Sequence, residues 1–181
     1  YISTISEPQQ RRVAAYFFQK FDLLVAPHIP ELRKAYIHSD FNEWNVLAEG
    51  DQVLGLIDFG DMVYSPLVNE VATALCYLSY DKDSFFDWTT PFLQAYHKII
   101  PLNKKEIGLL YYLIATKLCI SVCQSANARV LQPENDYASV SEKNAWKMLH
   151  KLLVLNPISV ENHFIDALGL SKEKTTDITQ K

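Results

Sequence analysis

The segment that decides the fold lies between residues 36 and 61, where residues 36–47 read YIHSDFNEWNVL and residues 55–61 read GLIDFGD. Three short apolar runs, at 35–37, 46–48 and 53–59, predict strands, and Glu49-Gly50-Asp51 predicts a tight turn between the last two. Polar side chains gather where these runs end. Short strands with polar ends form a rigid platform, so this segment is the candidate functional site.

Asp40, Asn45 and Asp58 are the residue types that phosphoryl transfer needs. That reaction needs a carboxylate to orient or deprotonate the attacking hydroxyl, and oxygen ligands that hold Mg²⁺ against nucleotide phosphates. Asp40 can face the hydroxyl, while Asn45 and Asp58 can supply the metal ligands. We expect Gly60 to permit the sharp turn that keeps Asp58 pointed inward.

The combined pattern is H-x-D, an Asn five residues after the Asp, an apolar hairpin and then Asp-Phe-Gly. It resembles the catalytic and metal-binding loops of the aminoglycoside phosphotransferase and choline kinase superfamily, which shares the protein-kinase fold. The usual loop of that family reads H-G-D-x-x-x-x-N, and Ser39 stands here in place of the Gly. The resemblance implies that Asp40 is the catalytic base, that Asn45 and Asp58 bind Mg²⁺, and that ATP is the co-substrate.

The resemblance also implies a fold and two supporting residues. We expect an α+β, mostly helical domain: the C-terminal lobe of the protein-kinase-like fold, with a small β-hairpin region that carries the catalytic and metal loops. His38 resembles the histidine that braces the catalytic loop, and Glu70 the acidic residue that braces it from the next helix. The motifs cover residues 35–75, and the rest agrees with the family in outline.

Apolar residues at helical spacing predict six helices in the remainder of the chain. Their expected ranges are 12–25, 67–78, 84–100, 103–130, from Ser139 or Ser141 to Pro157, and 159–168, with Asn103 as a cap of the longest one. Residues 1–170 would form the kinase-like lobe. Residues 171–181 are charged and rich in Thr, which predicts a disordered tail.

The spacing after Asp58 favours a small acceptor over a peptide. Protein kinases place a long activation segment after Asp-Phe-Gly and end it with Ala-Pro-Glu. Here Pro66 and a helix follow Gly60 almost at once. The acceptor is then an amino alcohol, a hydroxy amino acid or an aminoglycoside-like compound.

The helix expected over 103–130 carries a polar line of residues four apart: Lys117, Ser121, Ser125 and Arg129. Two interpretations stay open, because the line could face solvent or the site. In the second, Ser125 and Arg129 would bind the acceptor, and Arg129 would clamp a carboxylate. That would favour a hydroxy amino acid, as in the hydroxylysine and homoserine kinases of this family.

No segment of the sequence matches the ATP-gripping lobe of a kinase. There is no G-x-G-x-x-G stretch, and the chain opens with Tyr1. We expect the catalytic C-terminal part of a longer kinase, inactive alone, whose partner is the missing N-terminal lobe. One alternative is a non-catalytic binding module derived from such a lobe. Another is a metal-dependent hydrolase that uses His38, Asp40 and Asp58, although the other histidines show no ligand spacing.

Composition limits the remaining classes. Hydrophobic residues make up 49% of the 181, which suits one domain with a core. A net charge of −4 argues against nucleic-acid binding, and no apolar run reaches the length of a membrane span. The three cysteines have no metal-site spacing, and their odd number indicates a reducing cytoplasm. The oligomeric state stays open.

Overall fold

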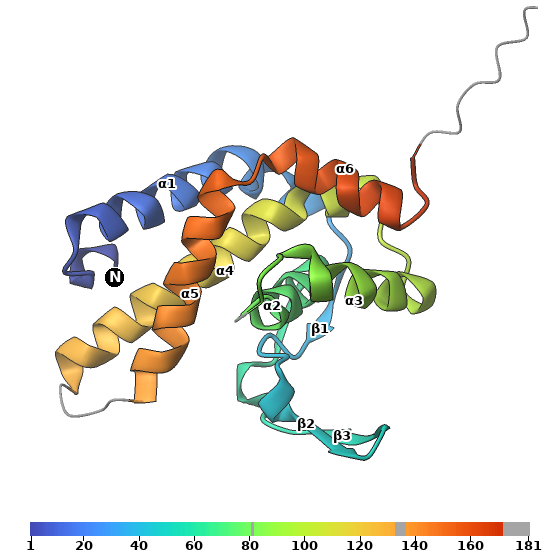
Figure 1. Ribbon diagram of the computed structural model, residues 1–181, viewed down its shortest axis with the longest axis horizontal. Coiled ribbons are helices and arrows are strands. Elements are labelled where there is room, and N and C mark those ends of the chain that lie inside the picture. Colours follow the sequence, from blue (N-terminus) through green and yellow to red (C-terminus); the bar gives the residue numbers. More distant parts are fainter. Residues whose placement is uncertain (81, 133–136, 172–181) are drawn as a thin grey trace, which may run out of the picture.

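The computed structural model describes residues 1–80, 82–132 and 137–171, with the backbone alone for 137–141. The disordered tail predicted for 171–181 lies, apart from residue 171, outside the described residues. Within these described ranges, six α-helices dominate the fold, and two small antiparallel sheets complete it (Figure 1). The prediction of a mostly helical α+β protein is therefore confirmed.

The helices lie close to their predicted ranges. They are α1 (Pro8–Leu24), α2 (Val68–Leu78), α3 (Phe86–Ile99), α4 (Lys104–Leu131), α5 (Tyr137–Val154) and α6 (Pro157–Ala167). The first begins four residues earlier than expected, because Pro8 takes the first helical position and the Glu7 side chain caps the helix by accepting from Gln9 N–H.

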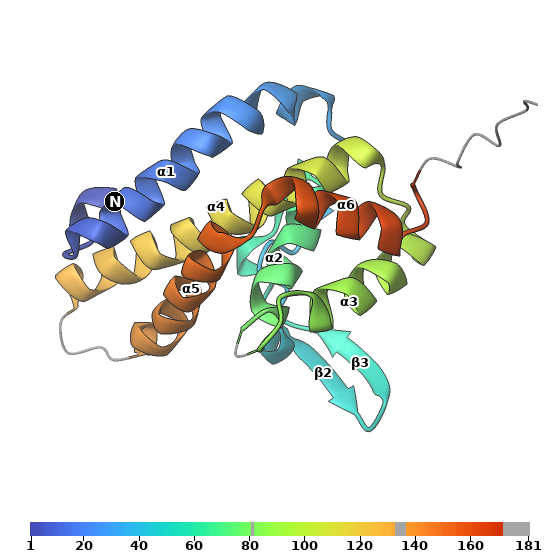
Figure 2. The same cartoon turned by 45° about the horizontal axis from the view of Figure 1, so that its top comes forward.

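The central element is α4, which packs against α1, α2, α5 and α6. Figures 1 and 2 show it running through the middle of the helices. Its buried side chains recur at helical spacing and include Ile107, Leu110, Ile114, Leu118 and Val122. The helix is long and apolar enough to cross a bilayer, but 72% of its most apolar window is buried, as in the core helix of a folded domain.

The start of α4 is tied to the strand region by a buried carboxylate. Glu106 closes a capping box with Asn103 and is 1% exposed. The Arg33 guanidinium donates to both carboxylate oxygens, at 2.8 and 2.6 Å, and these bonds raise the pKa of Arg33. Arg33 directly precedes the first strand, so this pair fixes α4 against the strand that leads into the site.

The strands form two separate pairs. β1 (Lys34–Ile37) pairs with β4 (Val63–Pro66), and β2 (Val46–Glu49) pairs with β3 (Gln52–Leu56). The β2–β3 hairpin extends away from the helices (Figure 2). The sequence did not predict β4, because this four-residue run ends in Pro and has little alternation of apolar and polar residues. The third strand ends at Leu56, earlier than the predicted Phe59, because the backbone turns at Asp58.

Candidate active site

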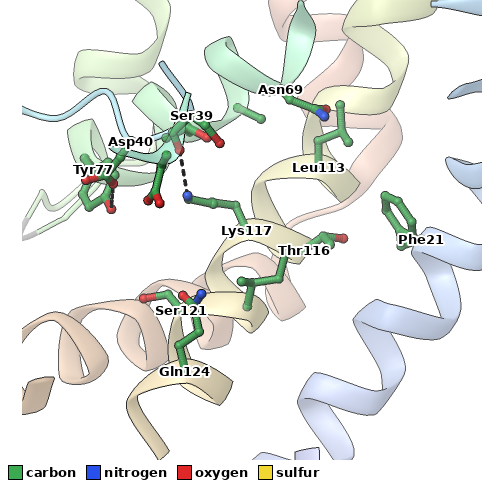
Figure 3. A pocket seen from close by; sticks show the side chains of 14 residues that line it. Phe21, Ser39, Asp40, Asn69, Tyr77, Leu113, Thr116, Lys117, Ser121 and Gln124 are labelled. Atoms are coloured by element: carbon green, nitrogen blue, oxygen red, sulfur yellow. Dashed lines mark hydrogen bonds between the residues drawn. The ribbon is translucent and has the colours of Figure 1, made fainter. Parts of the chain in front are cut away.

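The loop after β1 is held at Ser39 by two helices. Ser39 has a φ of 68°, the left-handed region where glycine is favoured. Its N–H donates to Glu70 Oε2 on α2 at 2.8 Å, and its carbonyl accepts from Lys117 Nζ on α4 at 2.9 Å (Figure 3). Ser39 therefore adopts a backbone conformation that suits glycine. One hydrogen bond to α2 and one to α4 anchor the loop at this residue.

The Asp40 carboxylate is fixed by three donors. Tyr77 Oη on α2 donates to Oδ1 at 2.6 Å, and the Asn42 and Asn45 side-chain amides each lie 3.2 Å from Oδ2. Both amides also donate to the Asp40 carbonyl, at 3.0 and 2.9 Å. This carboxylate is half-buried, held in one orientation, and lies on the wall of a cleft.

His38 joins the loop of Asp40 to the segment that carries Asp58. Its ring is 7% exposed, Nε2 lies 2.8 Å from the Ile57 carbonyl, and Nδ1 lies 3.4 Å from the Asp40 N–H. A carbonyl only accepts, so we assign the proton to Nε2 and leave Nδ1 as an acceptor. Both ring nitrogens face protein partners, which disfavours the hydrolase alternative in which His38 is a metal ligand.

Asp58 stands at a sharp backbone turn. It has a φ of 62°, and with Ser39 it makes up the non-glycine residues of positive φ in the described ranges. Such strain clusters at functional sites. We expected Gly60 to supply this turn, and that prediction was wrong: Asp58 itself takes the left-handed conformation, which Asp tolerates through its short polar side chain.

Asn45 and Asp58 lie on neighbouring loops and carry the oxygen atoms that a Mg²⁺ site would use. Ile57, the residue before Asp58, donates its N–H to the Asn45 carbonyl at 3.0 Å, so the two loops run side by side. Asn45 is buried and Asp58 is exposed. An amide oxygen and a carboxylate fit Mg²⁺, which takes few protein ligands and leaves its other positions to phosphates and water.

The cleft beside Asp40 has a volume of about 480 Å³. The loop of Asp40 and residues of α2 and α4 surround it, and Phe21 of α1 lies at its far side (Figure 3). Its charged lining residues are Asp40, Asp61 and Lys117, and Thr73, Tyr77, Ser121 and Gln124 add polar groups. A small polar acceptor can therefore reach Asp40 from this cleft.

The polar line on α4 only partly faces the site. Lys117 and Ser121 line the cleft, whereas Ser125 and Arg129 are not among its lining residues. Arg129 donates instead to both carboxylate oxygens of Glu142 on α5. The line spans roughly 18 Å along the helix, at 1.5 Å per residue, which is longer than one side of such a cleft. The structure therefore does not place Ser125 and Arg129 where they could bind the acceptor.

Tyr77, which donates to Asp40, is partly buried, and this burial affects the pKa of its hydroxyl. Burial and the hydrogen bond to Asp40 raise the pKa of Tyr77 well above its usual value. Its hydroxyl therefore stays protonated and remains a donor to the carboxylate over the whole range of an enzyme assay.

A model of the phosphotransferase enzyme family (APH) matches residues 5–104. That range includes the loops of Asp40 and Asp58 and exceeds half of the chain. The chain belongs to this family. The family assignment agrees with the resemblance that the H-x-D and Asp-Phe-Gly motifs indicated.

Several curated proteins are similar to the chain. A hydroxylysine kinase from Danio rerio is 24% identical over 92% of the chain and 49% of its own length. One from Bos taurus is 28% identical over 89% of the chain and 46% of its own length. A homoserine kinase from Rhizobium etli is 29% identical over 74% of the chain and 41% of its own length. The chain thus spans about half the length of the relatives it matches.

Sequence reasoning missed two residues that hold the loop of Asp40 in this phosphotransferase-family chain, Tyr77 and Asn42. Tyr77 follows Glu70 by seven residues, two helical turns, so both side chains lie on the face of α2 that meets the loop. That spacing could have identified Tyr77. Asn42 carries no such periodic signal, because its role comes from the irregular backbone of the loop itself.

Proposed function

We propose that the chain is the catalytic C-terminal lobe of an ATP-dependent kinase that phosphorylates the hydroxyl of a small hydroxy amino acid. The observation that carries the proposal is the Asp40 carboxylate, which lies on the cleft wall and is oriented by Tyr77 and two asparagines. A pre-oriented carboxylate is what an incoming hydroxyl requires, since phosphoryl transfer depends mainly on positioning.

Each site residue has a role in this proposal. Asp40 accepts a hydrogen bond from the acceptor hydroxyl and takes up its proton as transfer proceeds. Asn45 and Asp58 would hold Mg²⁺, whose chemistry is to neutralise charge on the nucleotide phosphates. His38 and Glu70 keep the two loops in register through the Ile57 carbonyl and the Ser39 N–H.

The acceptor class is supported by the relatives and by the cleft. The relatives named above are kinases of hydroxylysine and homoserine, two amino acids that carry a hydroxyl. A cleft lined by one cation and two carboxylates offers partners for both charges of an amino acid. An amino alcohol or an aminoglycoside has cationic groups and no carboxylate, so it would offer Lys117 no group of opposite charge.

An N-terminal lobe is the partner that this proposal requires. The hairpin and the turn after it carry large apolar side chains that are 40–68% exposed: Leu47, Val53, Leu54, Leu56, Ile57 and Phe59. An exposed apolar surface of this kind suits a covering partner, and the relatives have about half of their length beyond the matched part. Cytoplasmic residence belongs to the same proposal, supported by three free and buried cysteines.

The test is a substrate screen of the full-length protein. ADP release is followed with MgATP and a panel of hydroxy amino acids, amino alcohols and aminoglycosides, and the product is checked for a phosphate ester by mass spectrometry. We expect turnover with one or more hydroxy amino acids and little with the aminoglycosides. Nucleotide or acceptor binding without ester formation would contradict the proposal and favour a non-catalytic binding module.

A further inference from the structure

Lys117 is the basic residue among those that line the cleft. It projects from α4, and Nζ donates to the Ser39 carbonyl at 2.9 Å (Figure 3). Among the described residues, no carboxylate forms an ion pair with it. An ammonium group has three N–H donors, so two remain for a ligand in the cleft.

The position of Lys117 relates it directly to the candidate catalytic residue. The carbonyl that it binds belongs to Ser39, the residue immediately before Asp40. An acceptor whose hydroxyl meets Asp40 therefore lies within reach of the ammonium group. The same cleft is lined by the carboxylates of Asp40 and Asp61, which would repel an acidic group. The charge on Lys117 then decides whether an acceptor with a carboxylate can enter.

We propose that Lys117 selects acceptors that carry a carboxylate, by forming a charge-assisted hydrogen bond to that group. The inference rests on the proposed kinase function and names the residue that sets its substrate class. In this proposal Lys117 binds the carboxylate of the acceptor instead of Arg129, because Arg129 donates to Glu142 and lies outside the cleft lining.

The experiment compares Lys117→Met with the wild type in the full-length protein. The acceptors are L-homoserine and hydroxylysine, each paired with the amino alcohol that remains when its carboxylate is removed. We expect Lys117→Met to raise the ratio of KM for each amino acid to KM for its amino alcohol by roughly 10- to 100-fold. Loss of the bond to the Ser39 carbonyl should lower kcat for both kinds of acceptor alike. Lys117→Arg keeps the charge and should keep part of the preference. Lys104 is an exposed residue on the same helix and provides the matched control. Lys104→Met should leave KM unchanged for the amino acids and for the amino alcohols.

Two results would overturn the inference. An equal fall in kcat for both kinds of acceptor, with the ratio of their KM values unchanged, would show that Lys117 acts only through its bond to the Ser39 carbonyl. An equal rise in KM for both would show that the carboxylate is not what it recognises. Calorimetric binding of the same acceptors without nucleotide gives a second readout, and loss of the carboxylate preference in Lys117→Met is the expected result. Absence of turnover by the wild type itself would instead count against the proposed function.

Discussion

The hydroxyl of Tyr77 on α2 donates a hydrogen bond to the Asp40 carboxylate at 2.6 Å, across 37 residues of sequence. The oxygen that Tyr77 binds is not the one that the two asparagines contact, so the carboxylate is held from both sides. This bond makes the core helix part of the site, because the position of α2 fixes the rotation of the Asp40 side chain.

Tyr77→Phe should lower kcat and leave KM for ATP and KM for the acceptor nearly unchanged. The substitution removes a positioning donor and keeps the ring, so we expect a fall of roughly 10-fold, the scale of one hydrogen bond to a charged group. Steady-state kinetics of the full-length protein measures it. Tyr80 lies two residues after the end of α2, and its hydroxyl is not among the described groups that bond to Asp40, so Tyr80→Phe serves as the control. A purely structural role would instead lower the melting temperature and leave kcat intact.

The left-handed backbone at Ser39 predicts an unusual order of tolerance. Ser39→Gly should change the free energy of unfolding by less than about 1 kcal/mol and keep activity, because glycine adopts a φ of 68° without strain. Ser39→Val should cost about 1 to 3 kcal/mol or distort the loop, since a β-branched side chain opposes that conformation. Urea unfolding and kcat report both effects. Equal tolerance of Gly and Val would show that this backbone conformation is not required.

The Arg33–Glu106 pair should stabilise the junction of α4 and β1. Arg33→Met leaves a carboxylate that is 1% exposed without its cation. We expect a loss of about 2 to 4 kcal/mol, toward the low end for a broken buried pair because Arg33 is half exposed. Urea unfolding measures the loss, and Arg33→Met with Glu106→Leu should recover part of it. A double variant no more stable than Arg33→Met would contradict this explanation.

The buried thiol of Cys76 predicts a loss of stability in alkali. Burial raises its pKa from 9.0 to about 12. A group whose pKa is higher in the folded state contributes stability that is complete below pH 9 and is lost as the pH rises toward 12. The melting temperature should therefore fall over that range, and less steeply in Cys76→Ala. Parallel curves for the two proteins would show that this thiol does not contribute.

The sequence predicts the helices and the motif loops well, because both depend on local patterns. Periodic apolar residues place α4 and α2 within two residues of their observed ends, and the Asn103 cap is present. The motif spacing brings Asp40, Asn45 and His38 into one hydrogen-bonded group, and Glu70 contacts the backbone of the same loop. Their catalytic and metal roles remain predictions.

What the sequence could not provide depends on tertiary placement. The four polar residues of α4 share one face of the helix, as their spacing predicted. The spacing does not show which part of that face borders the cleft. The packing of α5 brings Glu142 to Arg129, and the loop after β1 brings the Ser39 carbonyl to Lys117. β4 was missed for the same reason, since its pairing with β1 is set by the return of the chain after the turn at Asp58.

The most direct test of the proposed chemistry is the rate of phosphoryl transfer in Asp40→Asn, measured by single-turnover quench of the full-length protein with MgATP and its best acceptor. The amide keeps the shape of the carboxylate and loses its capacity to take up a proton. We predict a fall of roughly 10²- to 10⁴-fold with nucleotide affinity unchanged. A rate within threefold of the wild type would contradict the role of Asp40 and with it the assignment of this cleft as the active site.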